Sequence, residues 1–207
     1  MSLLHHEALT EAIKDPNLDR RLVVMPLIDE AQIGPATLDV RLGTEFRVLR
    51  RIDDAGLDPG AGDEAHVERM QEHVTVPIGE SLWLHPGQFL LGSTLEYLRF
   101  PSHLGGYVVG RSSWGRVGLL VATAIMVQPG FGGNLTLELV NHGEGPIALY
   151  PGCRIAQLAV HALPGDTGHV YGGKYVGPIG PEVSRLTKER AEIEKLADVA
   201  DKLKSAT

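Results

Sequence analysis

Short apolar runs divided by turn residues are the feature that most limits how this chain can fold. They begin at Leu22 and continue to Leu163, and clusters of Gly, Pro and Asp separate them throughout. The runs cover residues 22–28, 37–49, 74–85, 88–98, 105–110, 119–127, 134–140, 146–150 and 154–163. No segment of crossover-helix length lies between them, so they predict the strands of a mainly β domain, arranged as a barrel or a sandwich.

Helical periodicity is found towards the two ends of the chain. Residues 5–14 predict a short helix whose apolar face is formed by Ala8, Leu9, Ala12 and Ile13, and Asp15-Pro16-Asn17 ends it. Residues 182–204 predict an amphipathic helix with a stripe formed by Leu186, Ile193, Leu196, Val199 and Leu203. The acidic, Gly-rich segment 52–66 predicts an exposed loop. One domain over residues 1–207, with a core at about 20–185, is the simplest organisation.

Charge and cysteine content exclude several classes of function. The net charge of -7 gives no overall positive field for a nucleic acid polymer or an acidic membrane surface. No apolar run approaches the ~20 residues that span a bilayer, so no membrane is expected. Cys153 is the only cysteine, which excludes a disulfide framework and a Cys-rich structural zinc site. We expect a cytoplasmic protein.

The segment Gly110–Arg116 has the composition of an anion site. It places two hydroxyls, Ser112 and Ser113, and two guanidiniums, Arg111 and Arg116, directly after a predicted strand. Main-chain N–H groups of a Gly-bounded turn, hydroxyl donors and forked Arg donors suit phosphate oxygens. A helix start capped by Ser and flanked by surface arginines explains the same residues, and on composition alone it is the better explanation.

Glu138 is the candidate for a catalytic carboxylate. Strict alternation over residues 134–140 puts three leucines on one face of a strand and Asn134, Thr136 and Glu138 on the other. If the polar face meets solvent, Glu138 is an ordinary surface residue. If it lines a cleft, it is a general base.

Other donors for phosphate are Arg154, Gln157, and Lys174 beside Tyr171, each weak when taken alone. A zinc-dependent deaminase is excluded, because it needs a P-C-x-x-C pair and the chain has one cysteine. We therefore expect neither zinc nor a protein-bound metal. No P-loop and no G-x-G-x-x-G turn occurs.

With these motifs in order, residues 20–185 resemble the dCTP deaminase family, a branch of the trimeric dUTPase superfamily. The segments that carry the resemblance are ATLDVRLG (36–43), LHPGQFLLGSTLE (84–96), GRSSWGRVGLL (110–120), QPGFGGNLTLELVN (128–141), GCRIAQL (152–158) and GGKYVGPIGPEVSR (172–185). Several linked motifs are much harder to meet by chance than any one of them. They favour the functional interpretation of Ser112, Arg116 and Glu138.

The resemblance implies a distorted, dUTPase-like β-barrel or jelly roll with short terminal helices, assembled as a homotrimer with active sites between subunits. Glu138 would take a proton from the water that attacks C4 of the cytosine of dCTP, Ser112 would hold that water or the leaving ammonia, and Arg116 would support the charge. A partly dry site raises the pKa of such a carboxylate towards neutrality. Further substrate contacts are implied for Arg111, Ser113, Thr123, Ala124, Gln128, Thr136, Gln157, Tyr171 and Lys174, with Mg²⁺ on the triphosphate.

Three positions depart from the family pattern. Between Gly118 and Gln128 the family shows a His-x-Thr-Ala stretch leading into Ile-Asp-Pro-Gly, whereas this chain is one residue shorter, and the His is either replaced by Ala122 or deleted. The Asp expected to bind the deoxyribose 3′-hydroxyl is Gln128, and a Gln of the C-terminal motif is Pro178. An amide in place of a carboxylate costs about 1–3 kcal/mol of binding if nothing compensates.

Three functions remain open on the sequence. The first is deamination of dCTP to dUTP, with or without hydrolysis of the triphosphate to dUMP. The second is a dUTP diphosphatase, which RIAQL favours and which Arg116 and the absent Gly-rich C-terminal motif oppose. The third is a nucleotide-binding or regulatory relative, or a deaminase with an altered nucleotide substrate, which the three departures favour.

Overall fold

The structure is a computed structural model that describes residues 2–50, 56–58, 64–122, 126–165, 167–168, 172, 177–185 and 189–205. The chain forms two compact units. The larger unit consists of residues 1–48 and 73–182, and the smaller one of residues 49–72 and 183–207. A single domain over residues 1–207 stays a prediction.

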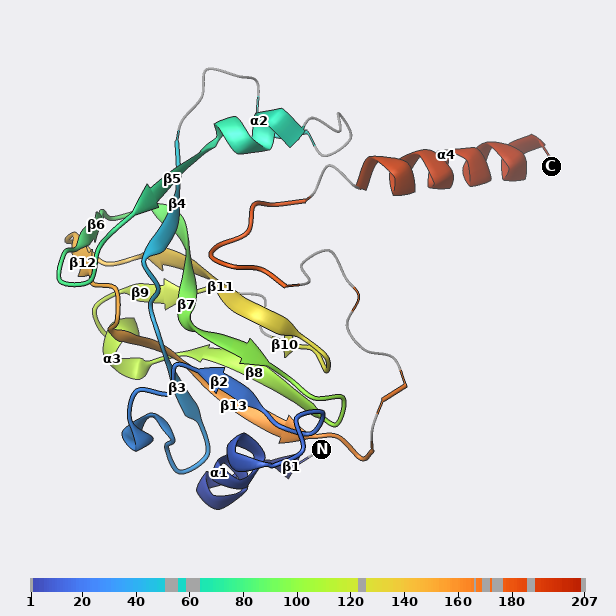
Figure 1. Cartoon of the computed structure of the whole chain (residues 1–207). Coiled ribbons are helices and arrows are strands. Elements are labelled where there is room, and N and C mark those ends of the chain that lie inside the picture. Colours follow the sequence, from blue (N-terminus) through green and yellow to red (C-terminus); the bar gives the residue numbers. More distant parts are fainter. Residues whose placement is uncertain are drawn as a thin grey trace. The chain divides into compact units, whose positions relative to one another are not determined.

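The described strands form three sheets (Figure 1). One has the order β1-β13-β8-β10, with β3 also paired to β13; the second has the order β5-β4-β7-β11-β9, with β2 also paired to β7; the third pairs β12 with β6. The strands are β1 (Ser2–Leu3), β2 (Val23–Met25), β3 (Leu38–Arg41), β4 (Glu45–Leu49), β5 (Gln71–Thr75), β6 (Leu82–Leu84), β7 (Phe89–Arg99), β8 (Leu104–Gly110), β9 (Leu119–Val121), β10 (Met126–Val127), β11 (Gly132–Asn141), β12 (Ile147–Leu149) and β13 (Arg154–Ala162). The mainly β prediction is confirmed, and the described strands form open sheets.

One core joins the two large sheets of the larger unit. Leu158 of β13 and Leu38 of β3 are buried in the same apolar cluster as Leu137 and Leu139 of β11 and Leu90 of β7. These residues belong to both sheets, so the sheets pack against each other through their apolar faces. Burial of each such side chain stabilises the fold by about 1.5–3 kcal/mol.

The N-terminal helix agrees with its prediction. Helix α1 (His6–Lys14) begins after His5, ends at Asp15 and buries Leu9 completely. Ala12 and Ile13 pack against the same core. The pattern of apolar residues three and four apart therefore gave both the helix and its buried face.

The C-terminal helix begins later than predicted. Helix α4 spans Glu189–Ser205 instead of residues 182–204; residues 182–185 are not helical, and the N–H of Glu182 donates to Thr136 Oγ1 (3.2 Å). Three short helices are also present: η1 (Glu30–Gln32), α2 (Glu64–Arg69), which takes up part of the segment predicted as a loop, and α3 (Ser112–Gly115). Among the described helices, none combines the length and apolarity needed to cross a bilayer.

Strand β7 contains a bulge opposite β11. Asn134 pairs with Tyr97 and Thr136 with Ser93, so the three residues 94–96 lie opposite Leu135 alone. Side chains satisfy the interrupted ladder: Thr94 Oγ1 accepts from the Leu135 N–H (2.9 Å), and the Asn134 amide donates to the carbonyl of residue 94 (3.0 Å). The bulge is therefore a fixed part of the sheet.

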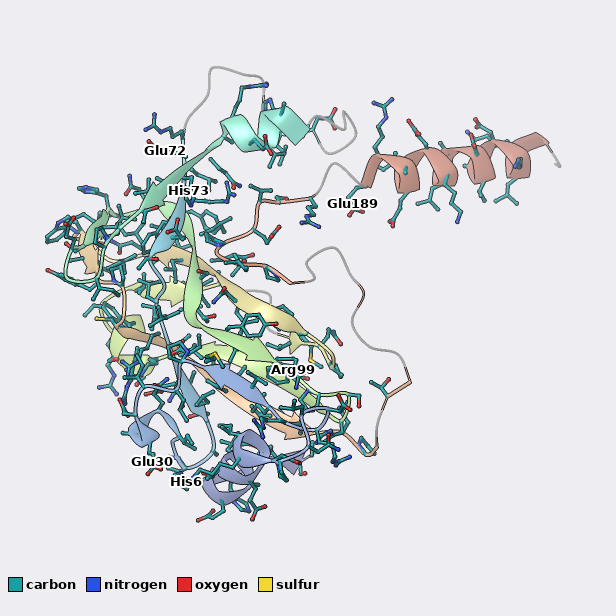
Figure 2. The ribbon with its side chains drawn as sticks, in the orientation of Figure 1. His6, Glu30, Glu72, His73, Arg99 and Glu189 are labelled. Atoms are coloured by element: carbon teal, nitrogen blue, oxygen red, sulfur yellow. The ribbon has the colours of Figure 1, made fainter. Side chains whose placement is uncertain are left out.

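Ion pairs and side-chain hydrogen bonds tie the ends of strands to their surroundings (Figure 2). Arg99, labelled at the end of β7, donates to the main-chain oxygen of Leu18. His73 of β5 lies 2.6 Å from Glu45 of β4. Both contacts are solvent-exposed, so each contributes little to stability.

Candidate active site

The turn α3 carries the predicted anion motif, and one carbonyl oxygen holds it in place. Trp114 Nε1 donates to the main-chain oxygen of Arg154 (2.9 Å), and Arg111 Nη1 donates to the same oxygen (3.3 Å). Figure 1 shows α3 beside the start of β13, where Arg154 lies. Because these two side chains point inwards, the hydroxyls of Ser112 and Ser113 stay exposed.

Arg116 ends α3 and is also exposed. Within the described part of the chain, the side chains of Ser112, Ser113 and Arg116 make no hydrogen bond or ion pair. The predicted donors thus form an open surface on the turn that joins β8, in one large sheet, to β9, in the other.

Gln157 lies beside Arg111, and Asp39 connects them. The Gln157 amide nitrogen donates to Asp39 Oδ1 (3.0 Å) and to Thr37 Oγ1 (3.2 Å). Arg111 Nη2 lies 3.6 Å from Asp39 Oδ2. The two N–H bonds of the Gln157 amide are engaged in this arrangement, so Gln157 presents its oxygen, which is an acceptor, to a ligand.

Glu138 stands on the face of β11 that the alternation predicted. Leu135, Leu137 and Leu139 are buried and face the core, whereas Glu138 is half-buried on the opposite face. Leu91 of β7 is its partner on one side, and on the other the N–H of Ala122 donates to the Glu138 main-chain oxygen (2.8 Å).

Burial raises the pKa of the Glu138 carboxyl above its ordinary value. The cause is desolvation, which disfavours the charged form of a carboxyl. A carboxyl in this condition accepts a proton more readily than a surface glutamate does, which is the property a general base requires.

Residues 177–182 form a strap across this polar face. The N–H of Gly177 donates to the carbonyl of Gly132 (3.0 Å), and the N–H of Asn134 donates to the carbonyl of Pro178 (2.9 Å). At its other end the carbonyl of Pro181 accepts from Arg47 Nε of β4 (2.8 Å). Since β7 lies between β4 and β11, the strap crosses β7 on the face of the sheet that carries Thr136 and Glu138.

The strap rests directly on the backbone of β11. A Cβ atom at Gly133, whose φ is +144°, would lie 2.4 Å from Pro178 Cδ. Pro178 is buried there. One of the three departures from the family pattern is therefore an anchor of the strap.

The other two departures are both exposed. Gln128 is exposed in the turn between β10 and β11, where the Phe131 N–H donates to its carbonyl (3.1 Å). Ala122 is exposed and lies beside Glu138, because its N–H donates to the Glu138 main-chain oxygen. Four predicted contact residues lie outside the described residues: Thr123, Ala124, Tyr171 and Lys174.

Comparison with known proteins identifies the family. The family described as dCTP deaminase-like matches residues 3–163, which is more than half of the chain and includes α1 and every strand from β2 to β13. The chain belongs to the dCTP deaminase-like family. The matched region ends before the strap.

Relatives in this family share about two fifths of their residues with the chain. A protein of Methanobrevibacter smithii named dCTP deaminase, dUMP-forming, is 39% identical over 192 residues, which are 90% of this chain and 96% of that protein. A protein of Natronomonas pharaonis named dCTP deaminase is 40% identical over 189 residues, 86% of this chain and 96% of that one.

A solved structure supports the fold. The crystal structure of 2′-deoxycytidine 5′-triphosphate deaminase from Agrobacterium tumefaciens matches with a TM-score of 0.58 at 23% identity. The match covers 77% of this chain and 48% of the solved chain. At this identity it shows that the dCTP deaminase-like chain shares the fold, and no more.

The predicted site residues of this dCTP deaminase-like chain fall into two groups. Gln157 on β13 and the turn α3 with Arg111 and its two serine hydroxyls form one group, and Thr136 and Glu138 on β11 form the other. Ser112 and Arg116 have no described side-chain partner, so the predicted catalytic trio is not joined by hydrogen bonds within one chain.

Two buried carboxylates were not predicted from the sequence. Asp39 is 7% exposed and Glu96 is fully buried. Glu96 accepts from the Arg41 N–H (2.8 Å) and from the Gln32 amide (3.0 Å), and burial raises its pKa. The available signal was an ionisable residue inside an apolar strand pattern, as in LDV and TLE.

Proposed function

We propose that the chain deaminates dCTP at cytosine C4 and hydrolyses the triphosphate, so that dUMP, ammonia and diphosphate are the products. Family membership supports the deamination, and the name dUMP-forming of the Methanobrevibacter smithii relative supports the second step. The observation that carries the assignment is Glu138, a half-buried carboxyl with a raised pKa on a face flanked by Leu91 and Ala122.

Glu138 is the proposed general base. It would take a proton from the water that attacks C4 and pass it to the departing amino group, which leaves as ammonia. The same desolvation that raises its pKa strengthens hydrogen bonds to the charge that develops on the ring. Thr136, two residues away on the same face, would contact the base or the sugar.

Ser112 and Arg116 would complete the site from a neighbouring copy of the chain. Their side chains are exposed and have no described partner, which suits groups whose ligand is bound between subunits. Ser112 would hold the attacking water or the leaving ammonia, and Arg116 would stabilise the negative charge. A homotrimer of this kind, acting in the cytoplasm, is part of the proposal.

The triphosphate would lie against the turn α3. Arg111 and Ser113 supply donors there, and Tyr171 and Lys174 of the C-terminal segment would add others. Mg²⁺ would arrive bound to the nucleotide, as part of the substrate. This fits the donor set, because Asp39, the carboxylate beside Arg111, already pairs with Arg111, Arg154 and Gln157. Gln157 would accept a hydrogen bond from a water at the metal or the nucleotide.

The test is incubation of the purified protein with dCTP and Mg²⁺, with dUTP, dUMP, diphosphate and ammonia resolved by chromatography. We expect dUMP, diphosphate and ammonia in equal amounts. Glu138→Gln should abolish the reaction, and Glu144→Gln, an exposed carboxylate in the turn after β11, should leave it unchanged. Cleavage of dUTP without deamination of dCTP would support a diphosphatase instead.

No reaction with either nucleotide, combined with tight binding of one, would support a regulatory relative or an altered substrate. The exposed Gln128, beside β11, is the position at which such a change would act. Turnover of a base- or sugar-modified cytosine nucleotide separates the two.

A further inference from the structure

Asp39 is a buried carboxylate that connects groups from two other segments, β13 and the turn α3. It lies on β3 and is 7% exposed. Its Oδ1 accepts from Gln157 of β13 (3.0 Å), and its Oδ2 lies 3.4 Å from Arg154 Nη1 and 3.6 Å from Arg111 Nη2. Neither the reaction nor the family match assigns this residue a role.

The contacts of Asp39 hold the two proposed triphosphate groups in one orientation each. Arg111 is fixed at two points, by Asp39 and by the main-chain oxygen of Arg154 (3.3 Å). Its side chain is 31% exposed, so its other donors remain open to a ligand. Gln157 is turned so that its nitrogen faces Asp39 and Thr37 and its oxygen faces away from them.

A second carboxylate in the same network has a different set of partners. Asp29, whose side chain is 43% exposed, pairs with Arg154 (3.1 Å) and Arg41 (2.9 Å). It contacts neither Arg111 nor Gln157 in the described contacts. Asp29 therefore shares the charge and the arginine neighbour of Asp39 but does not orient the proposed phosphate groups.

We propose that Asp39 is the positioning residue of the triphosphate subsite, and that it acts by fixing Arg111 and Gln157 before the nucleotide binds. The inference rests on the proposed function. Groups that are already ordered lose less conformational freedom on binding, and ordering one long side chain corresponds to about a tenfold change in affinity. In this role Asp39 acts on the nucleotide through Arg111 and Gln157.

The test compares dissociation constants for dCTP with Mg²⁺ and for dCMP, measured by calorimetry in the Glu138→Gln background. Asp39→Asn should weaken dCTP binding about tenfold and leave dCMP binding within about twofold, because dCMP lacks the β- and γ-phosphates. Asp29→Asn, the matched control, should leave both constants within about twofold. A general structural loss would weaken both nucleotides together.

A double-mutant cycle identifies the group through which Asp39 acts. In the presence of Arg111→Ala, Asp39→Asn should weaken dCTP binding by less than it does alone, because the group it positions has been removed. If Asp39→Asn weakens dCTP binding by the same factor with and without Arg111→Ala, the proposal is overturned. A variant that binds dCTP as tightly as, or more tightly than, the parent also overturns it, since that would mean that Asp39 only neutralises Arg111.

Two further measurements keep the outcome decisive. Urea unfolding establishes that each variant is folded. If Asp39→Asn does not fold, Asp39→Glu takes its place, because it keeps the charge and moves the carboxylate by one methylene. It must show the same selective loss of dCTP binding. Turnover of dCTP by the unsubstituted protein is measured in parallel. Its absence overturns the proposed function and this inference together, whereas turnover with an unaffected Asp39→Asn variant overturns only the role of Asp39.

Discussion

Substitution of Gly133 by alanine should detach the strap from β11. The new Cβ would lie 2.4 Å from Pro178 Cδ and 2.8 Å from Pro178 N, and backbone atoms of the strap cannot move aside as a flexible side chain can. The φ of +144° adds a conformational penalty of about 1–2 kcal/mol for a residue with a Cβ.

The hydrogen bonds of the strap account for the rest of the expected loss in the free energy of unfolding. Displacement breaks the bonds from Gly177 to Gly132 and from Asn134 to Pro178, each with a net contribution of about 1 kcal/mol. We expect Gly133→Ala to lower the free energy of unfolding by about 3 kcal/mol in urea titrations. Turnover of dCTP should also fall, because Lys174, a proposed phosphate donor, is three residues before Gly177.

The neighbouring glycine provides the matched control. A Cβ at Gly132 would lie 3.1 Å from the Tyr97 hydroxyl, and Tyr97 is 40% exposed and free to move. Gly132→Ala should change the free energy of unfolding by less than about 1 kcal/mol. Hydrogen exchange of the peptide covering residues 177–185 should speed up in Gly133→Ala only. Unchanged exchange and a stability within about 1 kcal/mol of the parent would refute the reasoning.

Three further substitutions test separate parts of the structure. The raised pKa of Glu138 means that the folded state favours the protonated carboxyl, so the cost of burying its charge is absent below the ordinary pKa of 4.5 and complete above the raised pKa. Glu138→Gln should therefore be more stable than the parent at pH 7. In urea titrations, this difference in the free energy of unfolding should disappear as the pH is lowered. Trp114→Phe removes a donor to the Arg154 carbonyl and should cost about 1 kcal/mol of stability together with a several-fold loss of dCTP affinity in calorimetry. Asn141 is fully buried and makes three hydrogen bonds, so Asn141→Ala should lower the thermal midpoint by far more than substitution of the exposed His142.

The elements that could be read from the sequence are those whose pattern is local. The alternation of β11 gave the strand, its buried leucines and the face of Glu138, because side chains of a strand alternate between two faces. The apolar face of α1 was predictable for a similar reason, with Leu9 at its centre. In both elements, one face packs on the core of the same unit.

Features that depend on distant parts of the chain could not be read in this way. The predicted beginning of α4 was wrong: residues 182–185 are not helical, and the N–H of Glu182 donates to Thr136, nearly fifty residues earlier, a contact of which the pattern of residues 182–204 contains no sign. Asp39 was overlooked for the same reason, since its partners Arg111 and Gln157 reach it through strand pairing. The packing of Pro178 on Gly133 follows from the path of the strap, which composition does not specify.

The bulge in β7 limits how the length of this strand can change in evolution. Residues 94–96 lie opposite one residue of β11, an excess of two, and an even excess keeps both halves of β7 in phase with the pleat. Deletion of a single residue there would turn one half over, so that Leu90 would leave the core and lie opposite Glu138, while Leu91 would turn towards the core. We therefore expect insertions and deletions at this point to occur in pairs, so that a family alignment shows gaps of even length there.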